Sequence, residues 1–232
     1  MINLMRLTDE IRDYQVTAAL PSEIIKTARE YEALAVLKFS FPDFFSDLHK
    51  DEAPDLQDPG GVLGVEVTWG GSPNDEKING ESKRYYHAKT NAEREKALKK
   101  IRENGGDIDE YSISFPPSNA NKDMNYVSNV FRKKLTKVNI YRQRFQYIGL
   151  AILMDIPMFF LTDLDWKKWI TDMNDGNFDF VAFIHWSGVD LYDFRAEKHI
   201  LCRIDRNDMD ALRKLARMTT EGIIKDDDPV WD

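Results

Sequence analysis

The segment from Pro54 to Trp69, PDLQDPGGVLGVEVTW, constrains the fold more than any other part of the 232-residue chain. Its centre, Asp58–Gly61, joins a proline that fixes φ to two glycines that tolerate positive φ, which is typical of a hairpin turn. The residues after the turn alternate between two faces, as a β-strand requires, and Glu66 lies opposite the more apolar face. We therefore expect a β-hairpin with Asp55 before its turn and Glu66 after it.

The two carboxylates of this hairpin, Asp55 and Glu66, would lie on adjacent strands. Hard divalent cations such as Mg²⁺ and Mn²⁺ prefer carboxylate oxygens as ligands. The hairpin therefore predicts a site for Mg²⁺ or Mn²⁺ held by these two residues. A solvent-facing acidic hairpin accounts for the same residues equally well, and this segment alone does not decide between the two.

The composition indicates one globular domain covering residues 1–232, with 42% hydrophobic, 12% aromatic and 31% charged residues. No apolar run approaches the roughly 18–20 residues that cross a bilayer, and the first residues lack the apolar region of a secretory signal. The single cysteine, Cys202, excludes an internal disulfide and fits a reducing compartment. The four scattered histidines do not suggest zinc. We expect a cytoplasmic protein with no membrane partner.

The formal net charge of −8 argues against general affinity for nucleic acid unless basic residues are concentrated locally. They are concentrated between Met124 and Met154, a stretch without a single acidic residue. Its six basic residues are Arg132, Lys133, Lys134, Lys137, Arg142 and Arg144. Outward-facing members of this set could follow a phosphate backbone, whereas lysine stems lying along a core helix are the alternative.

A first helix is predicted from Pro21 to about Phe39, with apolar residues at spacings of three, four and seven. On this helix Glu32 falls inside the apolar stripe and Glu30 points away from it. A carboxylate on the buried side of a helix must be paired or must bind a cation, because burying it alone is costly. We therefore take Glu32 as a candidate site residue, with structural pairing to a lysine as the alternative.

A second informative helix is predicted over Asn125–Phe145, where Lys134 falls in the middle of the apolar face and Lys137 at its edge. A lysine in the centre of a buried stripe needs an anion beside it. Lys134 is therefore a candidate for contact with the carboxylates of the hairpin, and Lys137 is the alternative candidate for the same contact.

The remaining pattern predicts an α/β fold in which a central mixed β-sheet is flanked by helices. Residues 147–154 form a continuous apolar run that is typical of a strand buried on both faces. We expect a loop over 70–82 and a loose acidic tail over 225–232. The other expected elements are helices over 91–102, 164–173 and 207–219, a strand over 178–186, and a hairpin formed by 189–194 and 200–204.

This order of a helix, a hairpin with two carboxylates, a helix with an inward lysine and a buried strand resembles the PD-(D/E)xK nuclease superfamily, which has the restriction-endonuclease-like fold. Pro54-Asp55 matches the first half of the motif and Glu66-Val67-Thr68 the second. Glu32 takes the place of the acidic residue on the first core helix. Thr68 departs from the family, because it stands where the motif lysine belongs. Some members supply that lysine from the following core helix, as Lys134 or Lys137 would here.

The resemblance covers about residues 21–154, followed by a strand and helix extension over about 155–225. It implies a Mg²⁺- or Mn²⁺-dependent nuclease that hydrolyses DNA phosphodiester bonds, and it leaves RNA open as a substrate. Asp55 and Glu66 would hold the metal, Glu32 would orient water or complete a second metal position, and Lys134 would stabilise charge on the phosphate. A homodimer or a partner protein is compatible with the sequence.

Two other functions remain open from the sequence. One is a catalytically inactive member of the same fold that binds protein or nucleic acid. The other is a small acidic interaction or immunity protein, which the net charge favours and the acid-free stretch opposes. Nucleophilic catalysis has little support, because no GxSxG motif is present and no histidine is evidently paired with Ser187. Cys202 is most simply a small buried residue.

Overall fold

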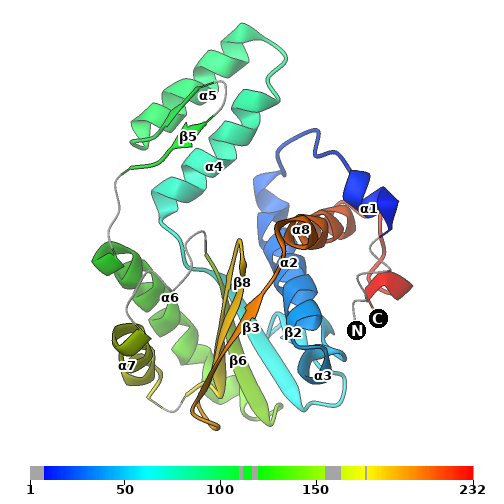
Figure 1. Ribbon diagram of the computed structural model, residues 1–232, viewed down its shortest axis with the longest axis vertical. Helices are drawn as coiled ribbons and strands as arrows, with labels where there is room; N and C mark the ends of the chain where they lie inside the picture. The colour runs from blue at the N-terminus through cyan, green and yellow to red at the C-terminus, as the bar shows by residue number, and fades with distance from the viewer. Residues whose placement is uncertain (1–7, 110–111, 117–119, 155–162, 176, 232) are drawn as a thin grey trace.

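The computed structural model describes residues 8–109, 112–116, 120–154, 163–175 and 177–231, and these form a seven-stranded sheet with helices on both faces (Figure 1). The expected α/β fold with a central mixed sheet flanked by helices is thereby confirmed. From one edge to the other, the strands are β1 (His49–Lys50), β2 (Leu56–Gln57), β3 (Leu63–Trp69), β6 (Tyr147–Leu153), β7 (Phe180–His185), β8 (Gly188–Asp193) and β9 (Lys198–Arg203).

The sheet is parallel in its centre and antiparallel towards both edges. Strand β6 pairs in parallel with β3 and β7, while β1–β2–β3 and β7–β8–β9 are antiparallel. The predicted hairpin is β2–β3, whose turn has Gly61 at a φ of 70° and a hydrogen bond from Gly61 N to Asp58 O. The register places Glu66 opposite Leu150 of β6, on the same face of the sheet.

Helices cover the two faces of the sheet unequally (Figure 1). Strand residues such as Val65 and Val67 pack with α2 (Ile25–Ser40) and α8 (Arg206–Thr220) in the larger core. Strand residues on the opposite face, such as Leu150 and Ile152, pack with α6 (Ala120–Tyr141) and α7 (Asp163–Asn174) in a second core. Glu66 therefore projects into the layer between the sheet and α6.

Segment 70–82, expected to be a loop, is mostly helical, and this prediction is wrong. Helix α4 (Pro73–Tyr86) begins at Ser72, whose side chain accepts a hydrogen bond from Asn74 N, with Pro73 in the first turn. It pairs with α5 (Asn91–Glu103) and the small ribbon β4 (Asp107–Ile108) and β5 (Ile113–Ser114). Figure 1 shows this unit beyond one end of the sheet, and a small apolar cluster of Ile78, Ile101 and Ile108 holds it together.

The C-terminal tail was expected to be loose, and this is also wrong. Trp231 is buried against Tyr31 of α2, with ring centroids 5.8 Å apart. Lys38 Nζ donates a hydrogen bond to Trp231 O at 2.8 Å. The short helices of this side of the molecule are α1 (Asp9–Asp13), η2 (Ser22–Ile24), α3 (Pro42–Phe45) and η4 (Pro229–Trp231).

The other predicted elements appear close to their expected bounds: α5, α6, α7, α8, β6, β7 and the β8–β9 hairpin. Within the described part of the chain, no helix has the length and apolar character needed to traverse a lipid bilayer.

Candidate functional site

Three carboxylates are almost completely buried beside the middle of β3: Glu66 with 1% of its surface exposed, Glu30 with 3% and Asp55 with 5%. They come from β3, from α2 and from the residue just before β2. Buried carboxylates are costly unless cations or hydrogen-bond donors surround them. The partners of each one therefore define the site.

Glu66 is bound by three side chains of α6. Its Oε1 lies 2.6 Å from Lys134 Nζ and 2.6 Å from Lys137 Nζ, and its Oε2 accepts a hydrogen bond from Tyr141 Oη at 2.6 Å. Lys134, Lys137 and Tyr141 share one face of α6, because Lys137 and Tyr141 lie three and seven residues after Lys134. Lys134 Nζ also donates to Val67 O at 3.3 Å. The predicted contact of Lys134 and Lys137 with the hairpin is thus present.

Tyr141 is held in its protonated form. Burial raises the pKa of its phenol, and the hydrogen bond to Glu66 raises it further. At neutral pH the hydroxyl is therefore a permanent donor to Glu66.

Asp55 joins the start of β2 to β3. Its Oδ2 accepts a hydrogen bond from Val67 N at 2.8 Å, and its Oδ1 lies 3.0 Å from Lys26 Nζ. Burial by itself would raise the pKa of this carboxyl, but the Val67 hydrogen bond, Lys26 and the charge of Lys134 together hold the pKa of Asp55 below its usual value. Asp55 is therefore an anion at neutral pH, within the field of Lys134.

Glu30 is the third carboxylate, and the sequence prediction missed it. Its Oε1 lies 2.9 Å from Lys26 Nζ and its Oε2 lies 3.3 Å from Lys50 Nζ. Lys26 thus bridges Glu30 and Asp55. The spacing of apolar residues gave no usable signal, because Glu30 precedes Ala33, Leu34 and Leu37 by three, four and seven residues and Glu32 precedes Ala35, Val36 and Phe39 by the same intervals.

Glu32, the residue predicted for this role, lies elsewhere, and its expected orientation is wrong. It is partly exposed and its Oε1 lies 2.8 Å from Arg213 Nε of α8. The reason is the position of α2 between the sheet and α8, which buries the helix on two sides. The side bearing Glu32 faces α8, and the side bearing Glu30 faces Asp55.

A pocket of about 290 Å³ opens beside Glu30 and beside the lysines that contact Asp55 and Glu66, although those two carboxylates do not themselves line it. Glu30, Lys26 and Lys134 line it, and so does Thr68, which replaces the motif lysine. The Arg29 guanidinium lies over the Trp69 ring, 4.8 Å from its centroid, and pairs with Glu76 at 2.7 Å. The remaining lining residues are Val67, Gly71, Pro73 and Val130. The site thus combines a hollow with buried carboxylates and cationic side chains.

The donor atoms fit a hard divalent cation better than any other cofactor, since Glu30, Asp55 and Glu66 offer only carboxylate oxygens. Glu30 Oε1 is buried and accepts no directed hydrogen bond, because its contact with Lys26 is an ion pair only. In the structure, however, these carboxylates contact lysines. Within the described ranges, no three His, Cys, Asp or Glu residues are grouped as a metal site requires. Three carboxylates contact four lysines: Lys26, Lys50, Lys134 and Lys137.

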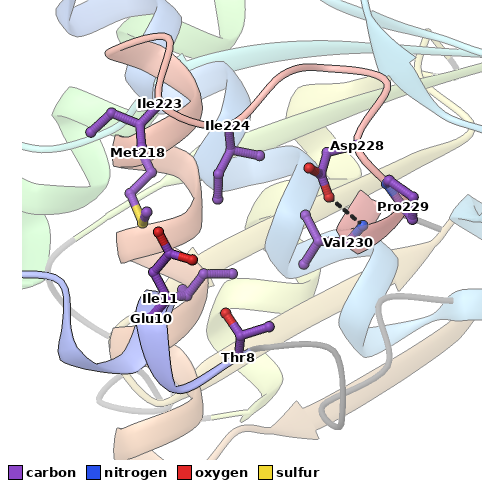
Figure 2. A pocket seen from close by; sticks show the side chains of 9 residues that line it. All are labelled: Thr8, Glu10, Ile11, Met218, Ile223, Ile224, Asp228, Pro229 and Val230. Atoms are coloured by element: carbon purple, nitrogen blue, oxygen red, sulfur yellow. Dashed lines mark hydrogen bonds between the residues drawn. The ribbon is translucent and has the colours of Figure 1, made fainter.

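A larger pocket of about 490 Å³ lies on another part of the molecule, between α1, the end of α8 and the C-terminal tail (Figure 2). Its wall is mainly apolar and includes Ile11, Met218 and Ile224. Val230 N donates to Asp228 Oδ1 at 3.0 Å within this wall. Because none of the three buried carboxylates lines it, size alone does not make it the candidate site.

Ser187 does have a histidine partner, contrary to the sequence interpretation. Its Oγ lies 3.1 Å from His185 Nδ1, and His185 Nε2 lies 3.2 Å from Asp190 Oδ2. The backbone N–H of Ser187 also donates to His185 Nδ1, at 3.3 Å. The contact therefore closes the two-residue β7–β8 turn, as a local side-chain to backbone bond commonly does.

Comparison of the chain with protein-family models, curated proteins and solved structures found no match.

Proposed function

We propose that the chain is a metal-dependent nuclease that hydrolyses phosphodiester bonds of DNA. Its active-site carboxylates would be Glu30, Asp55 and Glu66. The observation that carries the proposal is that three buried carboxylates are linked by lysines beside one pocket. Lys26 bridges Glu30 and Asp55, Lys134 contacts Glu66, and both lysines line the pocket together with Glu30. These residues come from four separate elements, and packing alone gives no reason to bury three acids together. RNA is a second substrate to be tested.

The topology supports the same proposal. Helix α2 is followed, after the short α3, by the antiparallel strands β1, β2 and β3, and α6 then leads into β6, which is parallel to β3. The α4–α5 unit with its small ribbon is inserted between β3 and α6. The carboxylates of the hairpin lie at the positions that the PD-(D/E)xK resemblance implies. Glu30 takes the helix position in place of Glu32. Lys134 of α6 reaches Glu66 where Thr68 lacks a charge, as in members with a displaced lysine.

The chemistry follows from the residue types. Asp55, Glu66 and Glu30 would hold Mg²⁺ or Mn²⁺, which supplies charge neutralisation of the phosphate and a lower pKa of water. Lys134, shared between Glu66 and the pocket, would contact the phosphate and stabilise negative charge that develops on it. Tyr141 would keep Glu66 oriented. The single, unpaired cysteine, Cys202, is compatible with a nuclease that acts in the reducing cytoplasm.

The test is cleavage of plasmid, single-stranded DNA and RNA with Mg²⁺ or Mn²⁺. We expect metal-dependent cutting that is lost in Glu30→Gln, Asp55→Asn and Glu66→Gln. Glu32→Gln is the matched control, because it makes the same change two residues along α2 on the side facing α8. Cutting that survives Glu66→Gln, or that Glu32→Gln abolishes while Glu30→Gln does not, would contradict the assignment.

A second candidate is an inactive fold of this kind that binds nucleic acid or protein. The pairing of all three carboxylates with lysines or other donors favours it, since such a site is stable without a metal. This candidate predicts binding that is weakened by salt, indifferent to divalent metal and unaccompanied by cutting.

A further inference from the structure

The side chain of Lys26 occupies an unusual position between two buried acids. Its Nζ lies 2.9 Å from Glu30 Oε1 and 3.0 Å from Asp55 Oδ1, although 73% of its side chain is exposed. The acids themselves are buried, and they belong to α2 and to the segment before β2. A single lysine with a largely exposed side chain therefore contacts two buried carboxylates.

The two contacts of Lys26 differ in quality. The contact with Asp55 is a directed hydrogen bond, whereas the one with Glu30 is an ion pair that leaves Glu30 Oε1 without a hydrogen bond. A buried carboxylate oxygen in this state is neutralised but not fully satisfied. A cation that binds both oxygens directly would satisfy them better than the ammonium does.

We propose that Lys26 is a built-in competitor of the divalent cation, and that loading of the metal onto Glu30 and Asp55 requires Lys26 to leave them. This inference rests on the proposed function. It assigns Lys26 a positioning role, because the lysine sets the affinity of the carboxylates for metal.

A Lys26 side chain that leaves the carboxylates would remain in the pocket. Lys26 already lines the 290 Å³ pocket together with Lys134, which is where the proposed function places the phosphate. The carboxylates already contact more positive charges than they carry, and a divalent ion adds two more. A phosphodiester that accepts Lys26 relieves this excess. Metal and nucleic acid should therefore each raise the affinity of the other, as linkage requires.

The experiment is calorimetric titration of Mn²⁺ into the wild type, Lys26→Met and Lys168→Met. Lys168 is the matched control, since it also pairs with an acid four residues on, Asp172, at 3.0 Å and is 77% exposed. We expect Lys26→Met to bind Mn²⁺ about tenfold tighter than the wild type, and Lys168→Met to bind as the wild type does. Lys26→Arg, which keeps the cation, should retain the weaker affinity.

Two further measurements use the same proteins. A non-hydrolysable phosphorothioate oligonucleotide should tighten Mn²⁺ binding by the wild type more than by Lys26→Met, because only the wild type has an ammonium to transfer. Without metal, Lys26→Met should melt at a lower temperature than the wild type, and Mn²⁺ should restore the loss.

The outcomes separate the inference from the function it rests on. Equal Mn²⁺ affinity in the wild type and Lys26→Met overturns the competitor role and leaves the metal-dependent nuclease intact. An equal gain in Lys26→Met and Lys168→Met also overturns it, because the effect would then be one of total charge. No Mn²⁺ binding by any of the proteins, with or without the oligonucleotide, overturns the nuclease proposal as well.

Discussion

Lys134 Nζ lies 2.6 Å from Glu66 Oε1 and joins the middle of α6 to the middle of β3 across 68 residues of sequence. The contact lies in the layer between helix and sheet, where Glu66 is fully buried and the lysine mostly so. Burying either charged side chain alone would cost free energy, and the ion pair between them reduces that cost. It also places the lysine at the wall of the pocket.

If Lys134 stabilises the phosphate, Lys134→Met should lower single-turnover cleavage by about 100-fold, as removal of one preorganised cationic or donor group commonly does. Lys137→Met should have a smaller effect, because the Lys137 side chain is about half exposed and does not line the pocket. The rate of cutting at saturating Mg²⁺ measures both.

Lys133→Met is the control for this pair, since Lys133 is the exposed neighbour of Lys134 on α6. It should leave the rate unchanged. Equal losses in Lys133→Met and Lys134→Met would mean that α6 acts by its overall charge.

The sequence could predict Asp55, Glu66 and Lys134 because each lies in an element whose periodicity is unambiguous. Strand alternation fixes the face of Glu66, and the stripe of α6 has one apolar side. Helix α2 has no such single side, since it lies between the sheet and α8 and is buried nearly all round from Glu30 to Lys38. A local pattern could therefore not decide between Glu30 and Glu32.

Helix α4 and the tail were missed for other reasons. Only one apolar residue of α4, Ile78, is fully buried, so the hydrophobic period is weak, and the useful signals were the Ser72 cap and Pro73. Trp231 depends on α2, almost 200 residues away, where Lys38 and Tyr31 contact it. Tertiary contacts of this kind leave no local trace in the sequence.

Asp179 is a structural counterpart of the site carboxylates, and its loss should destabilise the fold without touching the pocket. Its Oδ2 accepts from Ile148 N at 2.7 Å and from Arg142 at 2.5 Å, and its Oδ1 accepts from Arg195 at 2.5 Å. Because both arginines are partly exposed, we expect Asp179→Asn to lower the free energy of unfolding by about 2 kcal/mol rather than more.

Urea unfolding measures this loss. Asp172→Asn on α7, where the acid is largely exposed, is the control and should change the free energy of unfolding by less than about 0.5 kcal/mol. Similar losses in the two variants would show that the two arginines contribute nothing through Asp179.

The stability of the protein in acid should depend on Asp190. Burial opposes ionisation of this carboxyl, but hydrogen bonds from His185 and His199 hold its pKa below the usual value. A carboxyl whose folded pKa lies below its unfolded value, about 3.9, stabilises the fold above that pH and loses this contribution as the pH falls through the folded pKa.

Melting temperatures of the wild type and Asp190→Asn between pH 7 and pH 2 test this. The variant should melt lower than the wild type at pH 5–7, and the difference should shrink below about pH 4. A difference that stays constant down to pH 2 would show that packing, and not the charge of Asp190, accounts for its contribution.

The buried tail gives the clearest test of the fold itself. Trp231 is 3% exposed and packs on Tyr31, so Trp231→Ala should open a cavity and lower the free energy of unfolding by about 3 kcal/mol. Trp186, at the tip of the β7–β8 turn, is 51% exposed, and Trp186→Ala should cost less than about 0.5 kcal/mol. Both substitutions remove the same atoms, so the difference between their unfolding midpoints in urea reports burial alone. Equal midpoints would show that Trp231 is not packed against α2 and that the tail is loose, as its acidic sequence predicts.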